Sequence, residues 1–250
     1  MKSWNYQMIR PSQELAFFVD SFWMLHNLSD KPEEVIILPD GRVDLFFSIS
    51  MVEPFHISLQ GISTRPEQAS ILPGTKIFAI SLKLPAAEYI LHESIAHLAD
   101  NVKLLPGDFW GFNAGDIEDF DLFCRKANDK LMPMLPEETD NRKLELFNLI
   151  YTSNGSIPVQ ELSGKIFWSS RQINRYFTQQ FGISLKAYCN ILRFRASFGD
   201  ISQGKLFPQD NFSDQPHFIK EVKKFAGVSP RELKRNQNDR FIQFSTLPRK

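Results

Sequence analysis

The chain has 250 residues, of which 42% are apolar and 23% are charged, and its formal net charge is zero. A single core usually stops growing well below this length, so two domains are expected. No apolar run reaches the roughly 18 residues that a membrane-spanning helix needs, and the first residues lack the apolar centre of a secretion signal. Cys124 and Cys189 stand alone, without a neighbouring metal-ligand partner, which favours a reducing cytoplasm and argues against a disulfide scaffold or a zinc site.

The charges are divided unevenly along the chain. Residues 1–140 carry 11 Lys and Arg against 21 Asp and Glu, a balance of 11 − 21 = −10. Residues 141–250 carry 18 against 8, a balance of 18 − 8 = +10. Non-specific binding to DNA depends on phosphate neutralisation, so it needs basic residues gathered on one module. The asymmetry therefore indicates a basic nucleic-acid module joined to an acidic domain of another kind.

The N-terminal half shows both helix and strand patterns. Apolar residues three and four apart predict a first helix over residues 12–24. Asp40-Gly41 between apolar β-formers predicts a hairpin, because glycine accepts the positive φ of a tight turn. Short strands between turn residues predict an antiparallel β sandwich or barrel with flanking helices. The strands are expected at 35–38, 43–47, 55–60, 69–72 and 76–84, and the helices at 86–97 and 116–132, where Pro133 ends the last one.

An enzyme site is not evident in this half. Five histidines are present, but none stands in H-x-H or H-E-x-x-H, and there is no G-x-S-x-G and no glycine-rich phosphate loop. The carboxylates of Asp40 and Asp44 fit turn chemistry better than acid–base catalysis. We therefore expect no catalytic residue, no metal and no cofactor, while the mouth of a β-barrel is a common place for a small ligand.

The most informative stretch is residues 156–183, which reads as a short helix over 158–166, a tight turn and a second helix. Ser169 and Gln172 form a capping box at the start of the second helix, and Gly182 is its expected stop. Arginine pairs with guanine edges and asparagine with adenine, and the N-terminal part of such a helix lies deepest in the major groove. The predicted base-reading residues are Ser170, Arg171, Asn174 and Arg175.

Further helices follow this pair. A long helix is expected from Ser184 to about Ile201, with Arg193 on its flank as a candidate phosphate contact. A basic helix that carries Lys220 and Lys223 is expected to run to Phe225, with Asp214 or Ser213 as its cap. Ser229-Pro230-Arg231-Glu232 is a second capping box, and the tail at 238–250 is expected to pack back as a strand or to fray.

The two segments 156–196 and 210–233 resemble the DNA-binding domain of the AraC/XylS family of bacterial transcription regulators, which carries two helix-turn-helix units joined by one long helix. The matching motifs are QELSGKIFWSSRQINRYFTQQFGISLKAY, LRFRA and NFSDQPHFIKEVKKFAGVSP. Residues 10–110 resemble, less specifically, a small N-terminal β domain found ahead of such modules, through FVDSFW, ILPDGRVDLFF and TRP at 64–66.

This resemblance implies a first helix-turn-helix at about 158–182 and a second at about 205–227. It places Arg171, Asn174 and Arg175 against the groove in the first, and Gln215, Pro216 and Lys220 in the second. The interval 199–210 is shorter than the family pattern, because Leu206-Phe207-Pro208 cannot form a full helix, so the second unit is expected to be truncated.

The sequence therefore predicts an α+β protein with an N-terminal β-rich domain at 1–135, for sensing or dimerisation, and an all-α DNA-binding domain at 136–250. We expect a cytoplasmic, bacterial-type, sequence-specific transcription regulator, not an enzyme. Its expected partner is double-stranded DNA, with a small-molecule effector and a second copy of the chain as further candidates and no membrane. Two alternatives stay open: a protein-interaction module with a degenerate helix-turn-helix, and a small β-barrel enzyme with a basic accessory domain. Related to the second is a DNA-repair alkyl transferase that would use Cys189.

Overall fold

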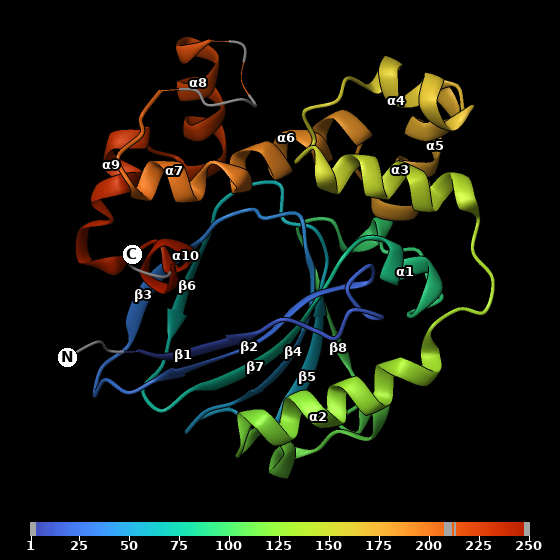
Figure 1. Ribbon diagram of the computed structural model, residues 1–250. Coiled ribbons are helices and arrows are strands. Elements are labelled where there is room, and N and C mark those ends of the chain that lie inside the picture. The colour runs from blue at the N-terminus through green and yellow to red at the C-terminus, as the bar shows by residue number, and fades with distance from the viewer. Residues whose placement is uncertain (1–3, 208–211, 213, 248–250) are drawn as a thin grey trace. The chain divides into compact units, whose positions relative to one another are not determined.

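A computed structural model describes residues 4–207, 212 and 214–247, and its contacts divide the chain into two compact units (Figure 1). Unit 1 comprises Met1–Glu34, Arg42–Gly61 and Ser70–Glu137, and unit 2 comprises Val35–Gly41, Ile62–Ala69 and Glu138–Lys250. Two short segments of the N-terminal half therefore belong to the helical unit, whereas the sequence led us to expect two consecutive domains. The fold is α+β, with an antiparallel sheet in the N-terminal half and helices in the C-terminal half, as predicted.

A six-stranded antiparallel sheet forms the body of unit 1. Its strand order is β1-β2-β7-β4-β5-β8. The strands are β1 (Trp4–Ile9), β2 (Val19–Asn27), β4 (Val43–Ile49), β5 (His56–Gln60), β7 (Lys76–Leu82) and β8 (Val102–Leu105). The register aligns Phe22, Ile80, Leu45 and Leu59 in one row across the four central strands. All four of these side chains are fully buried, so this face of the sheet is the apolar one.

Helix α2 (Phe120–Leu131) covers the apolar face of the sheet. The ring of Phe123 lies 5.2 Å from those of Phe47 on β4 and Phe78 on β7, both in edge-to-face geometry. Asp119 caps the helix by accepting a hydrogen bond from the Leu122 N–H (2.9 Å). The remaining helices of unit 1 are short: α1 (Pro85–Tyr89), η1 (Ala96–Leu98), η2 (Phe109–Gly111), η3 (Ala114–Ile117) and η4 (Met132–Met134).

The predicted helix over residues 12–24 is wrong. A single helical turn is present, in which the Val19 N–H donates to the Leu15 carbonyl (2.8 Å), and the chain then continues as β2. This strand is paired on both sides and buried along most of its length, so its apolar residues do not alternate with polar ones. A short apolar run of this kind cannot be told from a buried helix by periodicity.

The predicted hairpin at Asp40-Gly41 is also wrong. Gly41 has the positive φ (78°) that was expected, but β4 pairs with β5 and β7, while β3 (Glu33–Ile37) pairs with β6 (Glu67–Ile71) in a separate two-stranded ladder. The positive φ of Gly41 was predicted correctly, but the pairing of the two flanking strands with each other was not. The partners of a strand are decided by contacts distant in sequence.

Unit 2 is a helical bundle organised around α6. Its helices are α3 (Asn141–Thr152), α4 (Val159–Ile166), α5 (Ser170–Phe181), α6 (Leu185–Ala196), α7 (Phe198–Ser202), α8 (Gln215–Ala226), α9 (Pro230–Arg235), η5 (Gln237–Asp239) and α10 (Ile242–Thr246). Helices α6 and α7 run between α3–α5 at one end and α8–α9 at the other (Figure 1). Tyr188 packs against Phe177 of α5 (5.9 Å) and Phe194 stacks on Phe225 of α8 (5.3 Å), so α6 joins two aromatic clusters.

The long helix expected over 184–201 is divided at Ser197. The Ser197 hydroxyl, which is buried, donates to the Phe194 carbonyl (2.6 Å), and a serine that bonds to its own helix in this way favours a bend. The short α7 precedes α8 along the chain. Residues 208–211 and the candidate cap Ser213, which stand in the interval between them, lie outside the described residues. Asp214 caps α8, since its carboxylate accepts from the His217 N–H (2.8 Å).

Residues Val35–Gly41, which we call the strap, pack against α6 and α10 within unit 2. The Ile36 N–H donates to the Arg240 carbonyl (2.6 Å), and Ile36 forms a parallel bridge with Phe241. The side-chain amide of Gln243 pairs with the backbone of Leu38, accepting from its N–H (3.1 Å) and donating to its carbonyl (2.9 Å). Within the tail that was expected to form a strand or to fray, the described residues form the end of η5, one β-type bridge at Phe241 and the short helix α10, while residues 248–250 lie outside the described residues.

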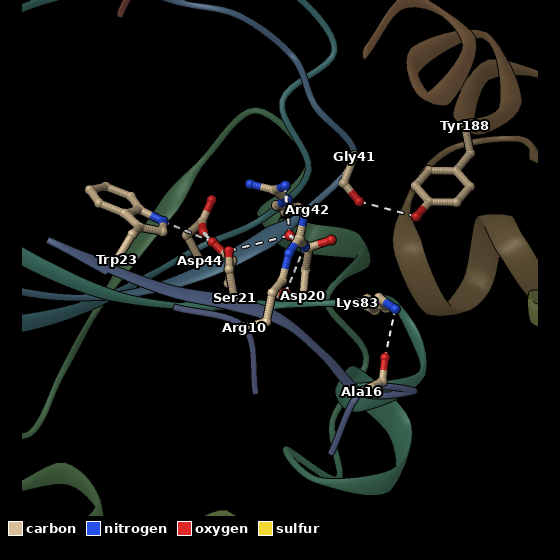
Figure 2. A network of polar contacts seen from close by, with 11 residues as sticks. Arg10, Ala16, Asp20, Ser21, Trp23, Gly41, Arg42, Asp44, Lys83 and Tyr188 are labelled. Carbon is tan, nitrogen blue, oxygen red and sulfur yellow. Dashed lines mark hydrogen bonds and ion pairs between the residues drawn. The ribbon is translucent and has the colours of Figure 1, made fainter. Parts of the chain in front are cut away.

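The end of the strap is fixed on α6. The Tyr188 hydroxyl donates to the Gly41 carbonyl (3.1 Å), as Figure 2 shows. A Cβ added to Gly41 would lie 3.0 Å from Leu192 Cδ2 and 3.1 Å from Tyr188 Cε2, so the glycine permits a close approach of the backbone to the helix. The strap therefore belongs to the core of the helical unit, although the β-rich half of the sequence encodes it.

Candidate nucleic-acid interface

The helix pair α4–α5 has the start and stop signals that the sequence predicted. The Ser169 N–H donates to Oε1 of Gln172 (2.9 Å) and the Gln172 N–H donates to the Ser169 hydroxyl (3.3 Å), which completes the capping box. At the other end Gly182 is left-handed (φ 76°), and its N–H donates to the Thr178 carbonyl (3.1 Å). These caps set the length of α5 at three turns.

One face of α5 is anchored in the core and the other faces solvent. Ile173, Phe177 and Phe181 are fully buried, and the Phe147 ring of α3 lies 5.8 and 5.9 Å from the rings of Phe177 and Phe181. Aromatic packing of this kind holds a helix in a fixed orientation. The opposite face can therefore present its side chains in a fixed array, which a base-reading helix requires.

The predicted base-reading residues differ in their placement. Arg171 and Arg175 are exposed, one helical turn apart. Ser170 is half-buried at the first helical position, and half-buried Asn174 donates from Nδ2 to the Ser170 carbonyl (3.0 Å). The structure therefore brings the two arginines together on one exposed face, while the Asn174 amide is engaged within its own helix.

Helix α8 presents a second set of exposed polar residues. Gln215 at its first position is exposed, as are Lys220 and Lys223 further along. Phe218 and Val222 are buried, and Lys220 lies on the opposite side of the helix from them. The α8 residues that the sequence singled out are thus all at the surface of unit 2.

Arg193 lies on α6 and is half-buried. Its Nη1 donates to the Gly155 carbonyl (3.0 Å), and its Nη2 donates to the Asn190 side chain. Gly155 is left-handed, and a Cβ there would lie 2.6 Å from the Cys189 carbonyl oxygen, so this loop packs tightly on α6. The Arg193 guanidinium joins the loop after α3 to α6. Because it is engaged within unit 2, the exposed residues of α5 and α8 are better candidates for a DNA contact.

The two units carry opposite charge. Over the ranges of unit 2 the sequence holds 19 Lys and Arg against 12 Asp and Glu, a balance of 19 − 12 = +7, and over unit 1 it holds 10 against 17, a balance of 10 − 17 = −7. Unit 2 has a smaller positive balance than residues 141–250 because it also includes Asp40, Glu138 and Asp140, but a balance of +7 still suits contact with phosphates.

One surface residue beside α5 was missed by the sequence reasoning. Phe167 follows α4 in the left-handed conformation (φ 55°, ψ 34°), and its side chain is 90% exposed. An aromatic residue in a turn between two polar helices was the available signal.

Unit 1 contains a second polar site on the face of the sheet opposite α2. The register aligns Ser21, Ser81, Asp44 and Gln60 in one row across β2, β7, β4 and β5. Ser21 and Ser81 are buried. The indole N–H of Trp23 donates to the Ser81 hydroxyl (2.9 Å), which in turn donates to the Asp44 carboxylate. In ligand pockets, a few hydroxyl or carboxylate groups of this kind fix the orientation of a small ligand.

A group of charged residues stands beside this row. Figure 2 shows the Asp20 carboxylate between two guanidinium groups, with an N–O distance of 2.6 Å to Arg42 and 3.2 Å to Arg10. Lys83 donates to the Ala16 carbonyl (2.6 Å). Burial lowers the pKa of Lys83, and Asp20 acts in the opposite direction, because its negative charge favours the protonated amine.

The two cysteines are both buried in the interior of their units. Burial raises the pKa of Cys189 to about 11 and that of Cys124 to about 12. A nucleophilic cysteine needs a lowered pKa and access, so this environment does not suit the alkyl-transferase alternative.

In the part of the chain that the structure describes, no helix is long and apolar enough to cross a membrane. Nor do His, Cys, Asp and Glu side chains gather there in threes or more in a way that would hold a metal ion.

Comparisons with known proteins give one family match and several structural matches. Residues 7–103 match the model of a family described as a domain of unknown function, DUF6597. No curated protein matches. Three solved structures of ToxT from Vibrio cholerae are similar along nearly the whole chain. One is bound to (E)-4-(8-methylnaphthalen-1-yl)but-3-enoic acid, with 14% identity, 92% of this chain and 98% of that chain covered, and a TM-score of 0.44.

The other two ToxT structures give similar values. The P21 form at 1.65 Å resolution has 14% identity, covers 92% of this chain and 97% of that chain, and has a TM-score of 0.42. The structure with unsaturated fatty acid bound has 12% identity, covers 92% and 93%, and has a TM-score of 0.39. At these identities the similarity concerns the course of the chain and not the residues of a site.

Proposed function

We propose that this chain is a sequence-specific DNA-binding transcription regulator of the AraC/XylS type. Helix α5 enters the major groove with Arg171 and Arg175 toward the base edges, and α8 contacts the duplex with Gln215, Lys220 and Lys223. Unit 1 regulates this binding, with a small molecule as the candidate effector. No covalent chemistry is required of any residue.

The observation that carries the proposal is the placement of Arg171 and Arg175. Both are exposed on a helix that is capped at its two ends and anchored by aromatic packing on its other face. A guanidinium group bonds bidentately to the O6 and N7 atoms of guanine, and a rigid helix at major-groove depth is the usual way to present it. The positive balance of unit 2 adds the sequence-independent part of the affinity.

The test is selection of bound fragments from a random duplex pool with the full chain, followed by affinity measurements on the selected site. Arg171→Ala and Arg175→Ala are each expected to cost about 1–3 kcal/mol of binding free energy and to relax the preference at one base pair. Lys223→Ala is expected to weaken all sequences about equally and to lower the salt slope by about 1.

A matched control comes from unit 1. Arg125 is an exposed arginine on α2, so Arg125→Ala removes the same charge from the surface of the other unit and is expected to leave the selected site's affinity and base preference unchanged. Absence of duplex binding by the unmodified chain at any ionic strength would contradict the proposal. Equal affinities for wild type and both arginine variants would contradict the assignment of α5 to the groove.

For the effector, the supporting observation is the polar row of unit 1, in which the Ser81 hydroxyl lies between Trp23 and Asp44. A small ligand that forms hydrogen bonds fits such a row better than a purely apolar one. A screen of small metabolites by thermal shift tests this part. A compound that binds at the row should stabilise the wild type and lose most of that effect in Ser81→Ala. A compound that stabilises both equally binds elsewhere.

A further inference from the structure

Phe167 combines two features that both cost free energy. Its backbone is left-handed (φ 55°), a conformation that is strained for a residue with a Cβ and that glycine or asparagine would adopt more easily. Its side chain is 90% exposed, the highest value among the exposed large apolar side chains of the described residues. Burial of the ring therefore does not offset the strain of the backbone. Backbone strain of this kind occurs more often at functional sites than at positions that serve only the fold.

The neighbouring residues show what an aromatic side chain in this turn does when it serves the fold. The Trp168 ring lies 5.8 Å from the Tyr176 ring, and the Arg142 guanidinium stands over it at 5.1 Å. Trp168 thus packs on α3 and α5, while Phe167, one position earlier, points to solvent. The two adjacent aromatic residues have opposite placements, and only one of them stabilises the unit.

The turn is held on both sides of Phe167. The Ser163 hydroxyl of α4 donates to the Trp168 carbonyl (2.6 Å), and Ser169 begins the capping box of α5. The backbone that carries the phenyl ring is therefore fixed at both ends. Because Phe167 stands two residues before the N-cap, it belongs to the end of α5 that also carries Arg171, the end that lies deepest in the groove in the proposed complex.

We propose that Phe167 is a specificity-determining residue that contacts the C5-methyl group of a thymine in the major groove. This inference rests on the proposed DNA binding by α5. Thymine is the one standard base that presents an apolar group in that groove, and an exposed aromatic ring held at the entrance of a recognition helix is suited to contact it. Contact with DNA would also remove the apolar surface of the ring from water, and this burial is favourable.

The first experiment removes single methyl groups from the DNA. In the duplex selected by the full chain, each thymine is replaced in turn by uracil, which pairs identically and lacks only the methyl. We expect one position at which the replacement weakens wild-type binding about three- to fivefold, the effect of burying one methyl group. Phe167→Ala should bind the thymine and uracil duplexes equally. A uracil penalty of the same size in the variant, or no penalty at any position with wild type, would overturn the proposal.

The second experiment separates a binding role from a folding role. Phe167→Gly removes the ring and relieves the left-handed strain, so the melting temperature of the unbound chain is expected to rise by about 2–6 °C while DNA affinity falls. A lower melting temperature would show that the ring serves folding and would overturn the inference, as would unchanged DNA affinity. Met51→Ala, which removes an 84% exposed apolar side chain from unit 1, is the control and should change neither DNA affinity nor the uracil penalty.

The outcomes distinguish the two proposals. If the unmodified chain binds no duplex, the proposed function fails, and the inference fails with it. If it binds and Arg171→Ala weakens it, but the Phe167 variants bind like wild type, only the thymine contact is refuted.

Discussion

Substitution of Gly41 by alanine should destabilise the helical unit, although residue 41 is encoded among the strands of the N-terminal half. Gly41 is left-handed, with a φ of 78°, and alanine in that conformation costs about 1–2 kcal/mol. The new Cβ would lie 3.0 Å from Leu192 Cδ2 and 3.1 Å from Tyr188 Cε2, closer than ordinary van der Waals contact, and overpacking of this kind costs about 1–3 kcal/mol. We expect a total loss of about 2–5 kcal/mol in the free energy of unfolding.

Two matched glycines separate the contributions. Gly227 in unit 2 has a φ of 71° and nothing within 4 Å of an added Cβ, so Gly227→Ala measures the conformational cost alone. Gly74 in unit 1 has a φ of 69°, and its nearest neighbour is a flexible methionine side chain at 3.7 Å, so Gly74→Ala measures the same cost in the other unit. Both controls are expected to lose about 1–2 kcal/mol.

The assay is urea unfolding of the full chain combined with hydrogen exchange of its peptides. In Gly41→Ala, the amides of α6 and α10 should exchange faster, because the strap packs against these helices, while those of α2 should keep their wild-type rates. The reasoning would be refuted if Gly41→Ala cost no more than Gly227→Ala. It would equally be refuted if faster exchange were confined to the peptides of unit 1.

Three further predictions concern single side chains. Ser169→Ala removes the cap of α5 and should lower the free energy of unfolding by about 0.5–2 kcal/mol, so an unchanged urea midpoint would contradict its capping role. Cys124 and Cys189, with pKa values raised by burial to about 12 and about 11, should resist a thiol reagent at pH 8 until the chain is unfolded, and rapid labelling of the native protein would count against their burial. Hydrogen bonds from Arg142 hold the pKa of Asp140 below its ordinary value, so its carboxylate stabilises the fold at pH values above that ordinary pKa, and this stability is lost as the pH falls through the lowered pKa. Asp140→Asn should therefore lose less stability than wild type on acid titration, whereas parallel curves would show that the carboxylate contributes nothing.

The elements that sequence reasoning placed well are those whose signals are local. The capping box of Ser169 and Gln172, the stop at Gly182 and the cap of α8, for which the sequence offered Asp214 or Ser213, all depend on residues within one or two helical turns of each other. The exposed face of α5 follows from the same periodicity, because a helix with a buried aromatic stripe must present its remaining residues to solvent. These features could be derived before any tertiary contact was known.

Only the tertiary structure decided the features that depend on residues far apart in the sequence. Val19–Asn27 is a strand because β1 and β7 pair with it on both sides, and the strap belongs to the helical unit because Tyr188 and Gln243 hold its backbone. Arg193 points to the Gly155 carbonyl, an arrangement that exists only once the loop after α3 folds onto α6. Capping and periodicity act through neighbours along the chain, whereas strand pairing and buried polar contacts join residues far apart in sequence, so their choice of partner is fixed only when the whole chain packs.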